Sequence, residues 1–128
     1  MFDMNVTPRF TLSNTVLDAV DANELAGFYR RLLGWDVRYE EPGFVILQSP
    51  EGGAGLSFQT NETYVRPVWP AGPGEPQMSM HLDIRVDDLE AAGHHAVNVG
   101  ATLAEFQPQD DVRVHLDPDG HPFCLFVN

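Results

Sequence analysis

The sequence predicts an α+β fold in which a strand–helix–three-strand unit occurs twice in tandem. Short segments of the first half recur in the same order in the second, at nearly the same offset: residues 20–21 as 86–87, Gly34 as Gly100, and 49–52 as 117–120. The last match is offset by two residues more, which a hairpin loop of different length would absorb. A helical pattern lies between the first two matches in each half, so duplication of one supersecondary unit is the simplest interpretation.

The first unit starts with a short apolar strand over residues 16–20. A helix is predicted over 22–33, because Asp21 can cap its start, Gly34 can cap its end, and apolar residues recur at helical spacing. Three strands are predicted next, over 35–40, 44–48 and 56–60, with Gly and Pro residues in the turns between them.

The second unit repeats this order, with a strand over 80–86, a helix over about 88–99, and strands over 102–106, 112–116 and 123–127. In the strand over 80–86, His81, Asp83 and Arg85 alternate with apolar residues, so these polar side chains share one face. Arg113 and His115 also share a face of their strand. Whether that face lines a pocket or meets solvent stays open.

Residues 61–77 separate the two units and contain four prolines and two glycines, which is typical of a linker. Because this segment also contains Trp69, we expect part of it to pack on the domain or over a pocket. The chain is therefore predicted to be one domain over 1–128, with module one at about 12–60 and module two at about 78–128.

Charge and composition exclude several classes of protein. The chain has 128 residues, a formal net charge of -12 and seven basic residues, all of which are arginines. Lysine Schiff-base chemistry is therefore excluded. A nucleic-acid partner is not expected, because binding a polyanion requires a basic surface.

The single cysteine, Cys124, cannot form an intrachain disulfide. No apolar run approaches the roughly 18 residues of a membrane span, and the N-terminal stretch Met1 to Phe10 lacks the basic and apolar regions of a signal peptide. These features predict a cytoplasmic protein with no membrane partner.

Five segments give the chain its resemblance to a known superfamily: residues 17–21, 28–35, 56–59, 81–89 and 117–125. In them the chain resembles the vicinal oxygen chelate superfamily, which includes glyoxalases, bleomycin-resistance proteins and extradiol dioxygenases, and it looks closest to the glyoxalase-like subgroup. The resemblance implies paired βαβββ modules whose curved mixed sheets form a cleft. It also implies a homodimer.

Metal-dependent members of this superfamily place one ligand, mostly His or Glu, on the first and fourth strands of each module. In this chain the resemblance puts His81 at the fifth-strand position, Ser57 at the fourth-strand position and Cys124 at the eighth. The first-strand position is ambiguous between Asn14, Thr15 and Val16. We therefore expect no cofactor. A divalent metal, if present, would be held by His81 and Cys124, with His115 as a candidate third ligand.

The leading hypothesis is a metal-independent protein that binds a small organic ligand of unassigned identity. Its predicted contacts are Thr15, Ser57, Gln59, Trp69, His81, Asp83 and Cys124. The alternative is an enzyme, a lyase, isomerase, hydrolase or dioxygenase, that uses His81 as a general base or holds a metal. A third hypothesis is a domain that serves mainly in assembly with a partner.

The remaining conspicuous side chains are predicted to be structural. Trp35 follows the end of the first helix and is expected in the core. His94, His95 and His121 are expected on the surface. The acidic run over 117–120 is explained by turn formation rather than by calcium binding.

Overall fold

The computed structural model describes residues 8–127, so the first seven residues of the Met1 to Phe10 stretch lie outside the described part. None of the helices within the described range is long and apolar enough to cross a membrane. The first half contains β1 (Asn14–Ala19), α1 (Ala22–Leu33), β2 (Asp36–Glu41), β3 (Phe44–Gln48) and β4 (Gly55–Thr60). The second half contains β5 (Leu82–Arg85), α2 (Leu89–Asn98), β6 (Thr102–Leu103), β7 (Val112–Leu116) and β8 (Pro122–Phe126).

The two halves have the same topology. The first sheet has the strand order β1-β4-β3-β2 and the second has β5-β8-β7-β6. In each sheet the first strand pairs in parallel with the last, and the other neighbouring strands are antiparallel. The predicted α+β fold with two tandem βαβββ modules is therefore confirmed.

The predicted ranges 22–33, 44–48 and 112–116 are found unchanged, whereas the strand predicted over 102–106 is reduced to Thr102–Leu103. The side chain of Gln107 explains the early end of β6. Its amide nitrogen donates to the carbonyl oxygens of Ala104 and Val114, and its amide oxygen accepts from the Val114 backbone nitrogen. The Gln107 side chain thus makes hydrogen bonds that the backbone of further strand residues would otherwise make.

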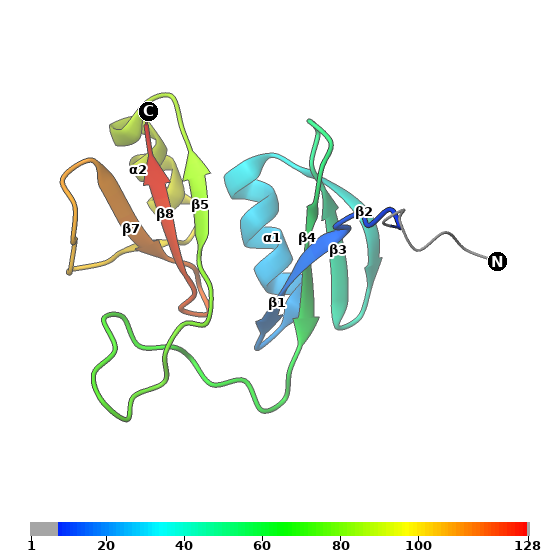
Figure 1. Ribbon diagram of the computed structural model, residues 1–128, viewed down its shortest axis with the longest axis horizontal. Helices are drawn as coiled ribbons and strands as arrows, with labels where there is room; N and C mark the ends of the chain where they lie inside the picture. Colours follow the sequence, from blue (N-terminus) through cyan, green and yellow to red (C-terminus); the bar gives the residue numbers. More distant parts are fainter. Residues whose placement is uncertain (1–7, 128) are drawn as a thin grey trace.

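Helix α1 lies between the two sheets (Figure 1). Its start is capped by Asp21, whose side chain accepts hydrogen bonds from two backbone nitrogens, and its end by Gly34 in the left-handed conformation, with φ of 73°. Tyr29 stacks on Phe58 of the first sheet, with ring centroids 5.4 Å apart, while Phe28 contacts Phe123 of the second sheet at 6.1 Å. One hydrophobic core therefore contains residues of both halves.

Each sheet has one face covered by helix and one face turned away from it. In the first sheet, Leu17 pairs with Phe58 in the core, so the neighbouring pair Val16 and Ser57 lies on the opposite face. We call this the outer face of the first sheet.

In the second sheet, Leu82 and His115 both pair with Phe123, a core residue, on the helix-covered face. Asp83 and Val114 both pair with Cys124, so these three residues lie on the outer face of the second sheet.

Candidate functional site

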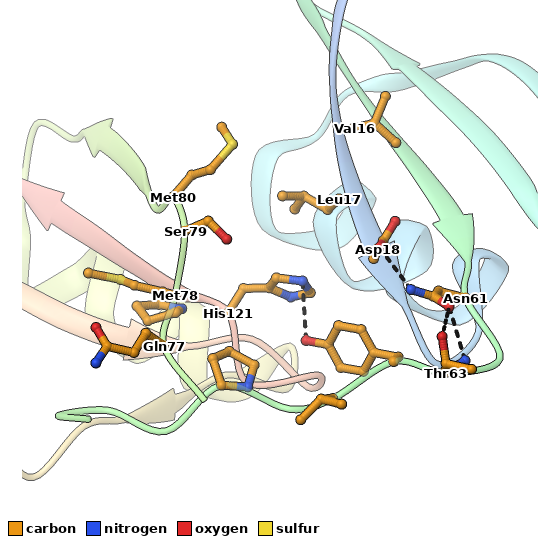
Figure 2. Close-up of a pocket in the computed structure, with 14 residues that line it drawn as sticks. Val16, Leu17, Asp18, Asn61, Thr63, Gln77, Met78, Ser79, Met80 and His121 are labelled. Carbon is orange, nitrogen blue, oxygen red and sulfur yellow. Dashed lines mark hydrogen bonds between the residues drawn. The ribbon is translucent and has the colours of Figure 1, made fainter. Parts of the chain in front are cut away.

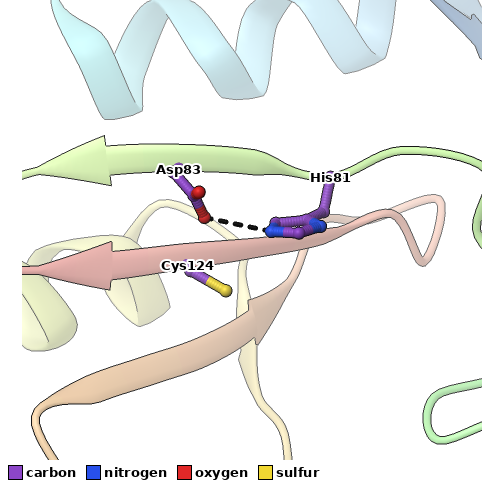
Figure 3. A group of neighbouring side chains, drawn as sticks. All are labelled: His81, Asp83 and Cys124. Carbon is purple, nitrogen blue, oxygen red and sulfur yellow. Dashed lines mark ion pairs between the residues drawn. The ribbon is translucent and has the colours of Figure 1, made fainter.

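His81, Asp83 and Cys124 form a cluster on the outer face of the second sheet (Figure 3). His81 lies directly before β5, Asp83 is within β5, and Cys124 is on β8 beside Asp83. The His81 Nε2 atom is 3.0 Å from Asp83 Oδ1. One donor atom of each residue lies within 4.8 Å of the others, so a single metal ion could contact all three.

The environment of this cluster keeps the thiol protonated. Burial raises the pKa of Cys124, and the charge of Asp83 together with a hydrogen bond to it raises that pKa further. The thiol is therefore a weak nucleophile in this protein, since the thiolate is the reactive form. A metal would have to displace the thiol proton to bind the sulfur.

A small pocket of about 160 Å³ opens beside the cluster and contains His81, Cys124 and Val114 in its lining. Trp69 and Met78, which precede β5, also line this pocket. The Trp69 indole nitrogen donates a long hydrogen bond of 3.4 Å to the backbone oxygen of Phe106. The expectation that part of the linker packs over a pocket is met at Trp69.

The predicted contact residues of the first half lie on the other sheet. Ser57 is fully buried, and its hydroxyl has no hydrogen-bond partner among the described residues. Gln59, on the same face, donates to Asp18 Oδ1 at 2.7 Å. Thr15 pairs with Leu56 and so lies on the opposite face, whereas Val16 is the β1 residue beside Ser57. The pairing thus resolves which of Asn14, Thr15 and Val16 neighbours Ser57.

A larger pocket, of about 460 Å³, lies where the two modules and their linker meet (Figure 2). We call it the inter-module pocket. Its walls come from β1, from the segment that joins the modules and from the turn before β8, and they combine apolar side chains such as Met78 and Met80 with polar Asp18, Tyr64 and His121. Because Met78 and Pro122 line both pockets, the two cavities are neighbours.

His121 is fixed in this pocket by a buried carboxylate. Its Nδ1 atom lies 2.8 Å from Oδ2 of Asp117, which is 1% exposed. The hydroxyl of Tyr29 on α1 donates to the same Asp117 oxygen at 2.8 Å, and the backbone nitrogens of Asp119 and His121 donate to the other. Asp117 therefore joins the turn between β7 and β8 to helix α1.

The hydrogen-bond directions assign a charge to His121. Tyr64 donates its only hydroxyl proton to the backbone oxygen of Asp119, at 2.7 Å, so it can only accept from His121 Nε2, which is 3.2 Å away. Nδ1 faces a carboxylate and must also carry a proton. Burial lowers the pKa of His121, but the hydrogen bond and charge of Asp117 outweigh it, and the net pKa is raised. Both ring nitrogens of His121 thus face acceptors, which favours the imidazolium form.

The prediction of a surface position for His121 is wrong, because its side chain is only 15% exposed. Asp117, four residues earlier in the same tight turn, is the signal that could have identified it, since such a turn brings the carboxylate to the imidazole. His94 and His95 are exposed as predicted, and Trp35 packs against the core.

Comparison with known proteins identifies the family. Residues 14–126 match the family described as glyoxalase-like domain. No curated protein matches the sequence.

Solved structures share the fold at low identity. A glyoxalase/bleomycin resistance protein/dioxygenase family enzyme from Burkholderia phytofirmans is 20% identical, with a TM-score of 0.71 over 92% of this chain and 98% of the other. A glyoxalase-related enzyme from Fulvimarina pelagi is 21% identical, with a TM-score of 0.68 over 92% of this chain and 88% of the other. A glyoxalase/bleomycin resistance protein from Albidiferax ferrireducens is 18% identical, with a TM-score of 0.63 over 91% and 98%.

Proposed function

Because the chain belongs to the family of glyoxalase-like domains, we propose that it binds a small organic molecule in its inter-module pocket. The observation that carries this proposal is the composition of that pocket, whose lining is half apolar and half polar and includes polar side chains held at fixed positions by their neighbours. A volume of about 460 Å³ is in the range of small-molecule sites.

Two polar groups of the pocket are already oriented for a ligand. The Asp18 carboxylate is held by the amides of Gln59 and Asn61, at 2.7 Å and 3.0 Å. The His121 imidazolium is held by Asp117 from the opposite ring nitrogen. Groups fixed by other side chains lose little conformational entropy when a ligand binds, which favours affinity. Binding through these groups needs no metal.

Methionine methyl NMR tests this proposal directly, because Met80 lines the pocket. The probes are a panel of aromatic carboxylates, aromatic amines and uncharged analogues. The proposal expects at least one probe to shift the Met80 methyl signal, assigned with Met80→Leu, in a saturable manner.

The matched control places the same bulky residue inside and outside the pocket. Ser79 lines the pocket, whereas Ser49 lies in the turn after β3. Ser79→Trp should abolish the saturable shift and Ser49→Trp should leave it. A panel in which no probe moves Met80, or equal binding by both tryptophan variants, would contradict the proposal.

A cytoplasmic homodimer is part of the proposal. Val16 and Tyr39 are apolar side chains on the outer face of the first sheet and are 45% and 48% exposed, so a second copy of the chain could cover them. The expected mass by light scattering is twice 14.2 kDa. Val16→Glu should yield the monomer, and a wild-type chain that is already monomeric would refute the dimer.

The second candidate function is a metal-dependent lyase or isomerase centred on the His81–Asp83–Cys124 cluster. An imidazole, a carboxylate and a thiolate suit zinc, and three protein ligands leave a position open for substrate, as in catalytic zinc sites. Metal analysis of protein purified without chelator should find stoichiometric ion that His81→Ala removes. If the wild-type protein holds no metal, the enzyme hypothesis is restricted to its other form, in which His81 acts as a general base.

A further inference from the structure

The charges around the inter-module pocket do not balance. Two residues of its lining carry a charge, the Asp18 carboxylate on β1 and the His121 imidazolium in the turn before β8. The chain contains no lysine, and none of the described residues that line the pocket is an arginine. The charge of His121 is matched by Asp117, whose Oδ2 atom lies 2.8 Å from Nδ1. The charge of Asp18 has no cationic partner in the lining, so the pocket is negative.

The Asp18 carboxylate keeps acceptor positions for a ligand. Its two oxygens accept one hydrogen bond each from the side-chain amides of Gln59 and Asn61. Both donors are neutral and a carboxylate offers about four lone-pair sites, so the charge stays uncompensated and about two sites stay open. Asp18 is half-buried, and an ion pair there is screened less than one on the open surface. Figure 2 shows it on the wall opposite Met80.

The Tyr64 hydroxyl, in the same pocket, is subject to this negative field. Burial raises the pKa of Tyr64, and three nearby carboxylates, including that of Asp18, raise it further, more than Arg66 lowers it. The Arg66 guanidinium donates to the backbone oxygen of Pro118 at 2.8 Å, and Arg66 does not belong to the lining. An anionic ligand in this pocket would be repelled by the same carboxylates, whereas a cationic ligand would be attracted.

Exposed apolar side chains form part of the pocket wall. Val65 is 64% exposed and Met80 is 56% exposed, and both lie in the segment before β5. Covering such side chains with the apolar part of a ligand removes them from water, which favours binding. The flexible thioether side chains of Met78 and Met80 can adapt to the shape of that part. The pocket therefore suits a molecule that combines an apolar body with a cationic group.

We propose that the inter-module pocket selects an organic cation, whose ammonium group pairs with Asp18 while its apolar body lies against Val65 and Met80. This inference rests on the proposed function and adds to it the chemical class of the ligand. The net charge of -12 acts in the same direction, because it attracts cations to the protein surface and repels anions.

Three probes of similar shape separate the charge of the ligand from its apolar body: naphthylethylammonium, naphthylpropanoate and naphthylethanol. Each is titrated into wild-type protein while the Met80 methyl signal is followed. The ammonium compound should bind at least about tenfold more tightly than the alcohol, because hydrogen bonds between charged groups are the stronger ones. The propanoate should bind more weakly than the alcohol. An ammonium affinity no higher than that of either other probe overturns the proposal.

Asp18→Asn removes the charge and keeps the shape of the side chain. It should weaken ammonium binding at least about tenfold. Alcohol binding should stay nearly unchanged, which also reports that the pocket of the variant is intact. The matched control is Asp111→Asn, which removes one exposed carboxylate outside the pocket and should leave both affinities unchanged. Undiminished ammonium binding in Asp18→Asn, or an equal loss in Asp111→Asn, overturns the proposal.

The three probes also distinguish the failure of this inference from the failure of the proposed function. If the alcohol or the propanoate shifts Met80 at least as readily as the ammonium compound, the pocket binds small molecules and only the cationic class is wrong. If no probe of any charge shifts Met80, the proposed function is wrong and the inference fails with it.

Discussion

Two histidine–aspartate pairs stand in the same module and differ almost entirely in burial. His81 and Asp83 are 3.0 Å apart, with side chains 38% and 63% exposed. His121 and Asp117 are 2.8 Å apart, with side chains 15% and 0% exposed. The first pair lies on the outer face of a sheet, whereas the second lies in a turn against helix α1. Similar chemistry therefore stands in different surroundings: Asp117 of the buried pair is tied to helix α1 through Tyr29, whereas both side chains of the exposed pair face solvent.

The largest expected effect follows from removing the buried charge. Asp117→Asn turns an acceptor of several hydrogen bonds into an amide and leaves the His121 imidazolium without its counter-charge. We expect a loss of about 3–5 kcal/mol in the free energy of unfolding, measured with urea. Asp83→Asn is the matched control and should cost less than about 1 kcal/mol. Equal losses in the two variants would remove the distinction between the pairs.

Tyr29→Phe tests the link between the buried pair and α1. The variant removes only the hydroxyl that donates to Asp117 at 2.8 Å and keeps the ring that stacks on Phe58. Hydrogen bonds to charged groups contribute about 1.5–3 kcal/mol, so the expected loss lies in that range. A neutral result would show that the hydrogen bond between Tyr29 and Asp117 adds nothing to the attachment of α1.

The buried pair should also make stability depend on pH. The folded-state pKa of His121 is raised above its unfolded value, so its contribution is fully present below the unfolded pKa and is lost as pH rises through the folded one. His115 acts in the opposite direction: its lowered folded-state pKa reduces stability in acid, as pH falls below its unfolded value.

The measurement compares wild type with His121→Gln by urea unfolding from about pH 6 to about pH 9, a range that starts near the ordinary histidine pKa. Wild type should lose stability over this range, and the variant should lose less. His81→Gln is the control, because His81 is exposed at the mouth of a pocket. A wild-type curve that matches the His121→Gln curve would contradict the imidazolium assignment.

The sequence predicted the exposed pair and missed the buried one, for a physical reason. Alternation along a strand indicates which residues share a face, so the sequence pattern alone places His81 and Asp83 together. Periodicity gives no such information in a turn. His121 contacts Tyr64, and its partner Asp117 is held by Tyr29. Both tyrosines are distant in sequence, and no local pattern reveals those contacts.

Similar limits explain the other differences. The helix over 22–33 was predicted to the residue, because its caps and its apolar spacing are local features. The first-strand neighbour of Ser57 stayed ambiguous, since a shift of one residue reverses every side chain of a strand and only the pairing with β4 fixes it. The early end of β6 depends on hydrogen bonds from the Gln107 side chain to the backbone. A hydropathy pattern does not reveal such hydrogen bonds.

The reactivity of Cys124 tests how strongly Asp83 acts on its neighbour in the exposed cluster. The negative charge of Asp83 contributes to the raised pKa of Cys124, so Asp83→Asn should lower that pKa and increase the thiolate fraction. Alkylation by iodoacetamide, followed by mass spectrometry near neutral pH, should proceed several-fold faster in the variant. Asp87→Asn, a carboxylate exchange beyond the end of β5, should leave the rate unchanged. If Asp83→Asn leaves the alkylation rate unchanged, burial alone raises the pKa of Cys124.

The smallest expected effect is the coupling between His81 and Asp83. Exposed ion pairs contribute about 0.2–1 kcal/mol, because solvent screens them and holding two side chains in place costs entropy. A double-mutant cycle with His81→Ala and Asp83→Ala, measured below the pKa of histidine, should give a coupling in that range. A coupling of several kcal/mol would show that this pair, like the buried one, serves the fold, and would weaken its assignment as a free ligand set. A value near zero leaves both side chains available to a metal or a small molecule.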